Sequence, residues 1–586
     1  MGQQKNLIVA IVISCAILLL FQFYFQPKQT AQPTPQQGIA APPTAPGAPA
    51  IATPATTVPT AAPRDKVLAQ NPRVKIVTPR LTGSIDLVGA KLDDLTLVDY
   101  REEPEPNSPE IVLLAPDGTA NPYAVQFGWV ASKSDVKVPG PDTRWTSAGG
   151  DLTPTHPVDL NWDNGAGLTF KRRIAIDADY MFTVTQSVAN AGSDKVSLYP
   201  YALISREGEV PTSNTYLLHE GPIGVVDGSL KEIKYSALKG SPPVEADTTS
   251  GWLGITDKYW LTALVPDQKE TVKTRFAHTP RGGTDLYQVD YRGAEHELAP
   301  GGTVSEEARV FAGAKQVALL DRYESVLGVP RFDRAIDFGW FYFLTKPIFL
   351  TLDFFYALIG NFGLAIMLLT VLIKLLFFPL ANKSYKAMSK MKQLQPEMAK
   401  LREKFGDDKA KLNQEMMALY KRVGANPMAG CLPIAIQIPV FFSLYKVLFV
   451  TIEMRGAPFF GWIHDLSAPD PTSVFNLFGL IPFALPHVLV LGVWPLIMGL
   501  TMWVQTNLNP PPGDPVQAKI FQFMPLMFMF MLANFPAGLV IYWAWNNTLS
   551  VLQQTVIMYR TGTPVDLFNR LGHRFTAAEK PQIEKK

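Results

Sequence analysis

Long apolar segments constrain the fold of this chain more than any other feature of its sequence. They cover residues 7–25, 359–380, 432–453, 487–507, 519–533 and 536–558. An α-helix needs roughly 20 predominantly apolar residues to cross the hydrocarbon core of a bilayer, and these segments approach or reach that length. The sequence therefore predicts a polytopic α-helical membrane protein with six spans.

Bulk composition hides this division of the chain. The net charge of +2 and the mean hydropathy of +0.08 over 586 residues are both close to neutral. These averages favour neither a nucleic-acid-binding protein nor a wholly water-soluble enzyme. The two cysteines, Cys15 and Cys431, lie in or beside apolar segments, so we expect no disulfide framework.

The N-terminal part is an apolar segment followed by a proline-rich one. The apolar stretch within residues 1–25 is longer than the usual core of a cleavable signal peptide, which predicts an uncleaved signal-anchor helix. From Gln26 to Pro63 the chain has ten prolines and a single charge, Lys28. Such a segment cannot bury a core, so we predict a disordered linker over residues 26–69.

Residues 70–330 have the alternation of a soluble β domain. The run RRIAIDADYMFTVTQSVAN, residues 172–190, predicts two strands joined at an Asp177-Ala178-Asp179 turn, and further short runs favour an antiparallel sandwich. Trp145 and Trp162 either line a sugar or peptide groove or, as we favour, pack in the core or at a sheet edge. Residues 331–357 mix charges, aromatics and Pro347, which predicts an interfacial amphipathic helix.

Basic residues in the short loops predict the orientation in the membrane. Residues 382–426 contain eleven Lys and Arg against five acids, which predicts a cytoplasmic loop. Residues 453–486 contain one basic residue and three acids, which predicts an outer loop. With six spans, both termini are then cytoplasmic, the β domain lies outside, and residues 561–586 form a basic cytoplasmic tail.

The basic loop carries its own helical pattern and predicts an antiparallel helical hairpin with a turn at Gly406 and Asp407. Apolar residues recur at intervals of three and four in two runs: Met391, Leu394, Met398, Leu401 and Phe405, and then Leu412, Met416, Leu419 and Val423. The methionine-rich stripe has two interpretations. The simpler is the packing seam of the hairpin itself, and the other is a docking surface for flexible partners.

Lys374 interrupts the apolar run of the first C-terminal segment. A lysine at the centre of a membrane helix costs roughly 2.5 to 3.5 kcal/mol on insertion scales. Either its side chain reaches the cytoplasmic interface, about six residues or roughly 9 Å away, or the charge has a function inside the membrane. Thr370 lies on the same helical face. The simplest explanation for a glutamine at position 437, in the next apolar segment, is a hydrogen bond between helices.

Several kinds of chemistry have no motif in this sequence. It contains no phosphate-binding GxxxxGK[ST], no GxSxG and no HExxH, and its histidines lack metal-ligand spacing. None of the five C-terminal segments has an acidic residue in its interior, which argues against a carboxylate-based ion relay. We therefore expect neither an enzyme nor a cofactor.

Four segments together resemble the YidC/Oxa/Alb family of membrane insertases. They are NKSYKAMSKMKQLQPEMAKLREKFGDDK (382–409), EMMALYK (415–421), NPMAGCLPIAIQIPVFFSLY (426–445) and FPAGLVIYWAWNN (535–547). The anchor, the linker and the large outer domain resemble the Gram-negative form of the family. The resemblance covers essentially the whole chain and implies a core of five conserved spans over residues 358–560, around a hydrophilic groove open to cytoplasm and lipid.

The resemblance also implies which residues bind clients. Lys374 stands where the family usually has a groove arginine, so positive charge is retained but the forked recognition of a carboxylate is not. Trp543 stands where relatives often have a second tyrosine. The groove residues implied are Lys374, Thr370, Gln437, Tyr542, Trp543 and Asn546. The hairpin residues implied are Met398, Leu401, Glu415, Met416, Tyr420 and Lys421.

The function implied is that of an insertase and chaperone of the Gram-negative inner membrane. Its expected partners are nascent membrane-protein clients, the Sec translocon with its accessory subunits, the ribosome, the signal-recognition-particle receptor and the lipid bilayer. Two alternatives stay open on the residues alone. A small-solute transporter would need inverted repeats and intramembrane acids, and neither is found. A sugar-handling envelope enzyme would need paired carboxylates in the β domain, which sequence spacing neither suggests nor excludes.

Overall fold

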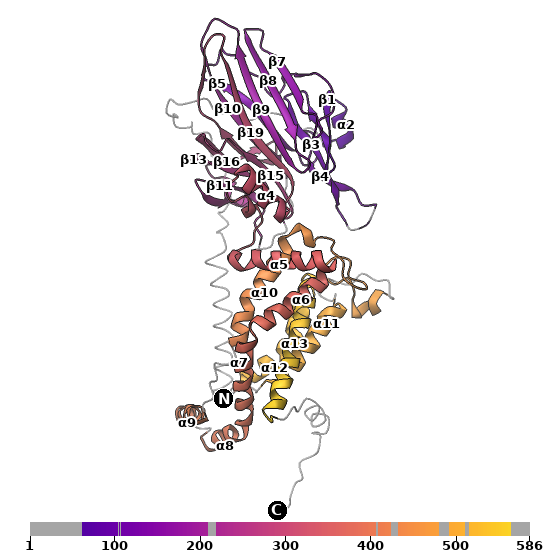
Figure 1. Ribbon diagram of the computed structural model, residues 1–586, viewed down its shortest axis with the longest axis vertical. Coiled ribbons are helices and arrows are strands. Elements are labelled where there is room, and N and C mark those ends of the chain that lie inside the picture. Colours follow the sequence, from indigo (N-terminus) through magenta and orange to yellow (C-terminus); the bar gives the residue numbers. More distant parts are fainter. Residues whose placement is uncertain are drawn as a thin grey trace, which may run out of the picture. The chain divides into compact units, whose positions relative to one another are not determined.

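The computed structural model describes residues 61–563, apart from 104, 106, 209–211, 213–217, 406–407, 424–431, 480–490 and 510–514. The strands gather in one part of the chain and most of the helices in another (Figure 1). The predicted anchor over 1–25 and most of the predicted tail over 561–586 lie outside the described residues, as does the predicted turn at Gly406 and Asp407.

Two antiparallel sheets form the β domain. The ten-stranded sheet runs in the order β1-β2-β3-β5-β10-β17-β16-β13, with β4 beside β3 and β18 beside β10. Its strands are β1 (Arg73–Val77), β2 (Leu81–Asp86), β3 (Lys91–Arg101), β4 (Glu110–Leu114), β5 (Tyr123–Ala131), β10 (Val196–Glu207), β13 (Val244–Thr248), β16 (Val272–Arg281), β17 (Thr284–Arg292) and β18 (His296–Leu298).

The nine-stranded sheet runs in the order β12-β11-β14-β15-β19-β9-β8-β7-β6. Its strands are β6 (Thr146–Ser147), β7 (Val158–Asp163), β8 (Leu168–Ile176), β9 (Met181–Asn190), β11 (Gly221–Val226), β12 (Ser229–Glu232), β14 (Gly251–Thr256), β15 (Trp260–Val265) and β19 (Thr303–Ala314). The predicted antiparallel sandwich is confirmed.

The hairpin β8–β9 shows how the sequence directs the sheet. Along β8, buried and exposed residues alternate, as a strand with one face on the core requires. Asp177 closes the turn because its Oδ1 accepts hydrogen bonds from the backbone N–H of Asp179 at 2.9 Å and of Met181 at 3.0 Å. Ile176 then pairs with Phe182, so the predicted strand–turn–strand unit is confirmed.

Both tryptophans singled out in the β domain pack against other side chains. Trp145 is buried beneath the guanidinium of Arg172, 4.8 Å from its ring centroid, and Trp162 lies against Phe170 at 5.5 Å. Arg172 belongs to the nine-stranded sheet and donates a hydrogen bond to the carbonyl oxygen of Phe127 in the other sheet at 2.6 Å. The packing interpretation is therefore confirmed, and Arg172 ties the two sheets together.

Helices make up most of the rest of the described chain. They are α2 (Arg64–Leu68), α3 (Tyr235–Leu238), α4 (Val317–Leu327), α5 (Tyr342–Ile359), α6 (Phe362–Leu376), α7 (Phe378–Gln393), α8 (Gln395–Phe405), α9 (Lys409–Val423), α10 (Leu432–Val450), α11 (Val493–Leu508), α12 (Pro515–Leu532) and α13 (Ala537–Arg560), with 3₁₀ turns η1 (Phe332–Ala335), η3 (Ile452–Met454) and η4 (Val474–Gly479). Helix α13 contacts α6, α7, α10 and α11, and so forms the centre of the helical core.

The predicted linker over 26–69 is wrong at its C-terminal end. Helix α2 forms there because Arg64 is held by the β domain: its guanidinium donates a hydrogen bond to Thr96 Oγ1 at 2.9 Å and pairs with Asp94. The predicted single helix over 331–357 is also wrong. It consists of η1 and α5, separated by a segment in which Gly339 has a φ of +73°, a conformation that favours glycine.

The first C-terminal apolar segment bends sharply after Leu376. Helices α6 and α7 meet at 70°, and Pro379 follows at the start of α7, where proline disfavours a helical conformation in the residue before it. Helix α7 then continues through Gln393, so the predicted first hairpin helix is broken before Pro396. The hairpin proper consists of α8 and α9 alone.

Only α5, among the described residues, is by itself long and apolar enough to cross a membrane; the bent pair α6–α7 adds a second candidate if it is taken as one span. Helices α10, α11, α12 and α13 lie at the predicted segments. The count of six spans stays a prediction, and so does the interfacial placement of α5.

Candidate functional site

A stripe of buried polar side chains runs along α13. Tyr542, Asn546, Ser550 and Gln554 recur at every fourth residue and are between 2 and 8 % exposed. Residues four apart lie on one side of an α-helix, so the four side chains follow one another along the helix. We call these four residues the polar stripe. The stripe concentrates hydrogen-bonding groups on a helix that contacts four other helices of the core.

The polar stripe contacts three other elements of the core. Tyr542 accepts a hydrogen bond from the Gln437 side chain on α10. Ser550 accepts one from Lys374 on α6. Gln554 donates one to Asn509 Oδ1, just after α11, at 3.1 Å. Because each bond joins a different helix to α13, the stripe is the point at which the predicted polar residues of separate segments meet.

Lys374 points into the core rather than along its own helix toward the end of α6. Its Nζ lies 2.6 Å from Ser550 Oγ, which in turn donates to the carbonyl oxygen of Asn546 at 2.8 Å. Within the part of the chain that the structure describes, no carboxylate forms an ion pair with Lys374. The ammonium group is thus held by a hydroxyl, and no carboxylate among the described residues compensates its charge.

The other predicted groove residues divide into two groups. Thr370 is buried and donates its hydroxyl to the carbonyl oxygen of Ile366 in its own helix at 2.7 Å. Trp543 packs edge-on to Phe441 of α10 at 4.7 Å and against Phe528 of α12 at 5.5 Å. Trp543 therefore lies in an aromatic contact between helices, whereas Tyr542 and Asn546 belong to the polar stripe.

The hairpin forms a small apolar cluster of its own. Leu394, Met398 and Leu419 are buried together, with Met391, Leu401, Met416 and Tyr420 packed around them. The Tyr420 hydroxyl lies 3.8 Å from Met398 Sδ, and Arg422 pairs with Glu397 at 2.8 Å across the two helices. The methionine stripe therefore serves as a packing seam. Of the remaining predicted hairpin residues, Lys421 is exposed and Glu415 half-buried.

The sequence analysis did not predict three residues of this site: Ser550, Gln554 and Asn509. A signal for the first two exists, because the four-residue repeat that begins at Tyr542 and Asn546 continues through Ser550 and Gln554. Ser443 on α10 is also buried, and its hydroxyl has no hydrogen-bond partner among the described residues.

Fold and site together define a protein with a buried polar stripe in an apolar helical core and a large β-sandwich domain. The family profile described as YidC periplasmic domain matches residues 73–351, and the profile described as 60Kd inner membrane protein matches residues 354–563. The chain belongs to the YidC family of inner-membrane proteins with a periplasmic domain.

Two relatives show how far this similarity extends. The chain is 51% identical over 617 residues to a membrane protein insertase YidC of Bradyrhizobium diazoefficiens, covering 98% of this chain and 99% of that protein. It is 50% identical over 593 residues to the corresponding protein of Rhizobium meliloti, covering 99% and 100%. A crystal structure of an active YidC insertase with its first transmembrane domain resolved matches 82% of this chain and 91% of its own, at 17% identity and a TM-score of 0.36.

The relatives are named as insertases and the family is not one of enzymes. The expectation that this chain is not an enzyme is therefore confirmed. The transporter and the sugar-handling enzyme, which the residues alone left open, have no support in the family.

Proposed function

We propose that this protein inserts and folds client membrane proteins through a hydrophilic groove built on the polar stripe of α13 and open to the cytoplasm and to lipid. The observation that carries the proposal is the inward ammonium of Lys374, 2.6 Å from Ser550 Oγ, in a core without a compensating carboxylate among the described residues. A half-buried charge without an ion-pair partner among the described residues is costly inside a membrane, so its presence indicates a use beyond packing.

The energetics of insertion require no nucleotide for lightly charged clients. About 20 leucine-like residues entering the bilayer supply roughly 6 to 12 kcal/mol, at 0.3 to 0.6 kcal/mol each. One charged residue at the centre costs roughly 2.5 to 3.5 kcal/mol. A client helix can therefore offset one or two charges on the segment that must cross. A hydrated groove shortens the apolar distance that these charges travel.

In this mechanism Lys374 attracts acidic groups of the translocated segment. The ammonium is a point charge, so it favours any nearby carboxylate rather than one particular geometry. Ser550 holds the ammonium toward α13 without neutralising it, which leaves the charge available to a client. Release is then easy, because a single exposed charge pair in a hydrated site contributes little lasting affinity.

The hairpin and the cytoplasmic loops supply the delivery side of the mechanism. We propose that α8 and α9, with both termini, face the cytoplasm, where ribosomes and the signal-recognition-particle receptor present nascent chains. The high basic content of residues 382–426 supports this placement. Clients with long or highly charged outer segments exceed the energy of one helix and would need the Sec translocon and its accessory subunits.

Depletion of the protein tests the proposed function directly. Cells from which it is removed should insert a small two-span client with a short outer loop at least tenfold more slowly, measured by protease protection of the newly made client. A secreted protein translocated in the same cells controls for general loss of membrane function. Unchanged insertion of the two-span client would contradict the proposed function.

Thiol labelling tests whether the groove is hydrated. In a chain with Cys15→Ala and Cys431→Ala, a membrane-impermeant thiol reagent added from the cytoplasmic side should modify Lys374→Cys within minutes. The matched control is Leu372→Cys, about 200° around the same helix and on its apolar, exposed face. Position 372 should react at least tenfold more slowly because it faces lipid. Equal protection of both positions would contradict a hydrated groove.

A further inference from the structure

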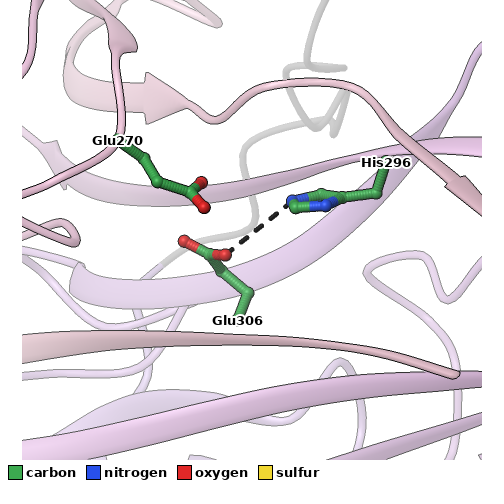
Figure 2. Close-up of side chains that lie close together, drawn as sticks. All are labelled: Glu270, His296 and Glu306. Atoms are coloured by element: carbon green, nitrogen blue, oxygen red, sulfur yellow. Dashed lines mark ion pairs between the residues drawn. The ribbon is translucent and has the colours of Figure 1, made fainter.

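Three side chains that commonly bind metals converge in the β domain. Glu270 comes from the connection between β15 and β16, His296 begins β18 and Glu306 lies in β19. Figure 2 shows the three side chains pointing toward one another. One ligand atom of each lies within 4.8 Å of the other two, and His296 Nε2 is 3.8 Å from Glu306 Oε2. The cluster therefore brings one nitrogen and two carboxylate ligands to a common point.

Glu306 occupies a position where the strand pattern calls for an apolar residue. Along β19 the inward-facing residues alternate with exposed ones, and the inward neighbours of Glu306 are Ala308 and Val310. Glu306 itself is only 8 % exposed, and within the described chain its carboxylate accepts no hydrogen bond. A buried carboxylate without a hydrogen-bond donor is strongly disfavoured, so a group that compensates its charge is needed.

The other two members also have unsatisfied atoms. His296 Nε2 and Glu270 Oε2 are both buried without a hydrogen-bond partner among the described residues. The imidazole packs edge-on to Trp129 at 6.0 Å, which holds the ring in its orientation. An unsatisfied buried polar atom costs about 1 to 3 kcal/mol. Three groups aimed at one point without a hydrogen bond between them, and with only the 3.8 Å contact of His296 and Glu306 joining them, indicate a ligand between them.

The local charge is negative and favours a cation. The carboxylates of Glu270 and Asp267 lie near Glu306, and no Lys or Arg forms an ion pair with Glu306 within the described chain. The environment thus resists a bare carboxylate and would stabilise one bound to a cation.

A second acidic cluster shows what a compensated site looks like. Asp321, Glu324 and Asp333 also lie close together, but the Lys346 ammonium donates to Asp321 Oδ1 at 2.8 Å and to Asp333 Oδ2 at 2.7 Å. A cationic side chain already pairs with two of the three carboxylates of that cluster. In the cluster around Glu306, no lysine or arginine of the described chain pairs with the carboxylates.

We propose that Glu270, His296 and Glu306 bind one divalent transition-metal ion, with zinc as the best match. Zinc takes histidine nitrogen and carboxylate oxygen at about 2.0 to 2.2 Å, so two of its ligands stand roughly 3.4 Å apart in a tetrahedral site. The separation of 3.8 Å between His296 and Glu306 needs only a small adjustment. An imidazole ligand disfavours calcium and magnesium, which prefer oxygen alone.

The bound ion would join the two sheets of the β domain. His296 lies on β18, which pairs with β10 in the ten-stranded sheet, whereas Glu306 lies on β19 in the nine-stranded sheet. Glu270 adds the connection between β15 and β16. Metal binding would therefore stabilise the β domain against unfolding, because the ion binds only when both sheets are in place.

Zinc titration of the full-length protein in detergent, after treatment with a chelator, tests the site. Calorimetry should show one zinc equivalent that Glu306→Gln and His296→Gln bind at least tenfold more weakly. Zinc should raise the melting temperature of the β-sheet signal in the unaltered chain but not in these two variants. The matched control is Glu307→Gln, the exposed next residue on β19, which should keep both effects.

Folding of the variants is checked by their metal-free melting curves. Should Glu306→Gln fail to fold, Glu270→Gln decides, since Glu270 lies in a connection between strands and should also weaken zinc at least tenfold. Zinc binding that is equal in the unaltered chain and in all three ligand variants would overturn the proposal. So would a titration in which the unaltered chain binds no zinc, or in which Glu307→Gln loses it equally.

Discussion

Replacing Lys374 by glutamate should lower the insertion of a client with an acidic outer tail at least tenfold, whereas Lys374→Arg should retain most of it. The glutamate would face the client's acids with a like charge, while arginine keeps the positive charge near Ser550. A tenfold effect corresponds to about 1.4 kcal/mol. This is well below the interaction energy of roughly 4 kcal/mol between two unit charges 4 Å apart at an effective dielectric constant of 20. Protease protection of the client in inner-membrane vesicles measures the effect.

A client with a neutral outer tail is the matched control for this charge effect. Its insertion should differ less than threefold between Lys374→Glu and the unaltered protein, because its tail carries no charge for residue 374 to attract or repel. Equal insertion of the acidic client by the glutamate and arginine variants would remove the electrostatic role of Lys374 from the mechanism. A loss shared by both clients would instead indicate a damaged helical core.

Deleting the hairpin helices, residues 395–423, should reduce insertion of the two-span client at least tenfold. These helices pack mainly against each other and the end of α7, through Leu394, Met398 and Leu419. Their removal therefore leaves the polar stripe of α13 and its contact with Lys374 in place. The loss would arise from the missing delivery surface rather than from unfolding of the core.

The β domain provides the comparison for the hairpin deletion. Removing residues 70–310 should lower insertion of the same client by no more than about threefold, since the proposed groove lies in the helical core. This effect is smaller than the change in insertion energy that a single charged residue causes in a membrane helix. Membrane levels of both deleted proteins, measured by immunoblot, normalise the rates. Normal insertion without the hairpin would refute its proposed role.

Local patterns predicted the individual elements well. The alternation along β8 and the Asp177 turn predicted a hairpin that the structure contains, and the apolar segments predicted α6, α10, α11, α12 and α13. The predictions that were wrong concern the ends of elements and the continuity of two predicted helices. Arg64 orders α2 through Asp94 and Thr96, which are thirty residues or more away. A prediction made from the local proline and alanine content does not include such a long-range contact.

The chemistry of Lys374 is the clearest case of information that local spacing lacks. Its distance from the end of the helix allowed either an interfacial ammonium or an inward one. Ser550, 176 residues later, receives its hydrogen bond, so the direction of the side chain depends on a helix far along the chain. The metal ligands of the β domain are similar, because Glu270, His296 and Glu306 come from three separate elements of the two-sheet sandwich.

The sequence by itself determined the class of protein, the division into a β domain and a helical membrane core, the basic hairpin and the identity of most polar residues in that core. Each of these depends on composition or on a period of two or 3.6 residues, which act over short stretches of chain. Only the tertiary structure decided which polar groups meet: the polar stripe of α13 with Lys374 and Gln437, and Glu306 with His296. Hydrogen bonds and metal ligation require atoms to be within a few ångströms, and packing between distant segments alone brings them there.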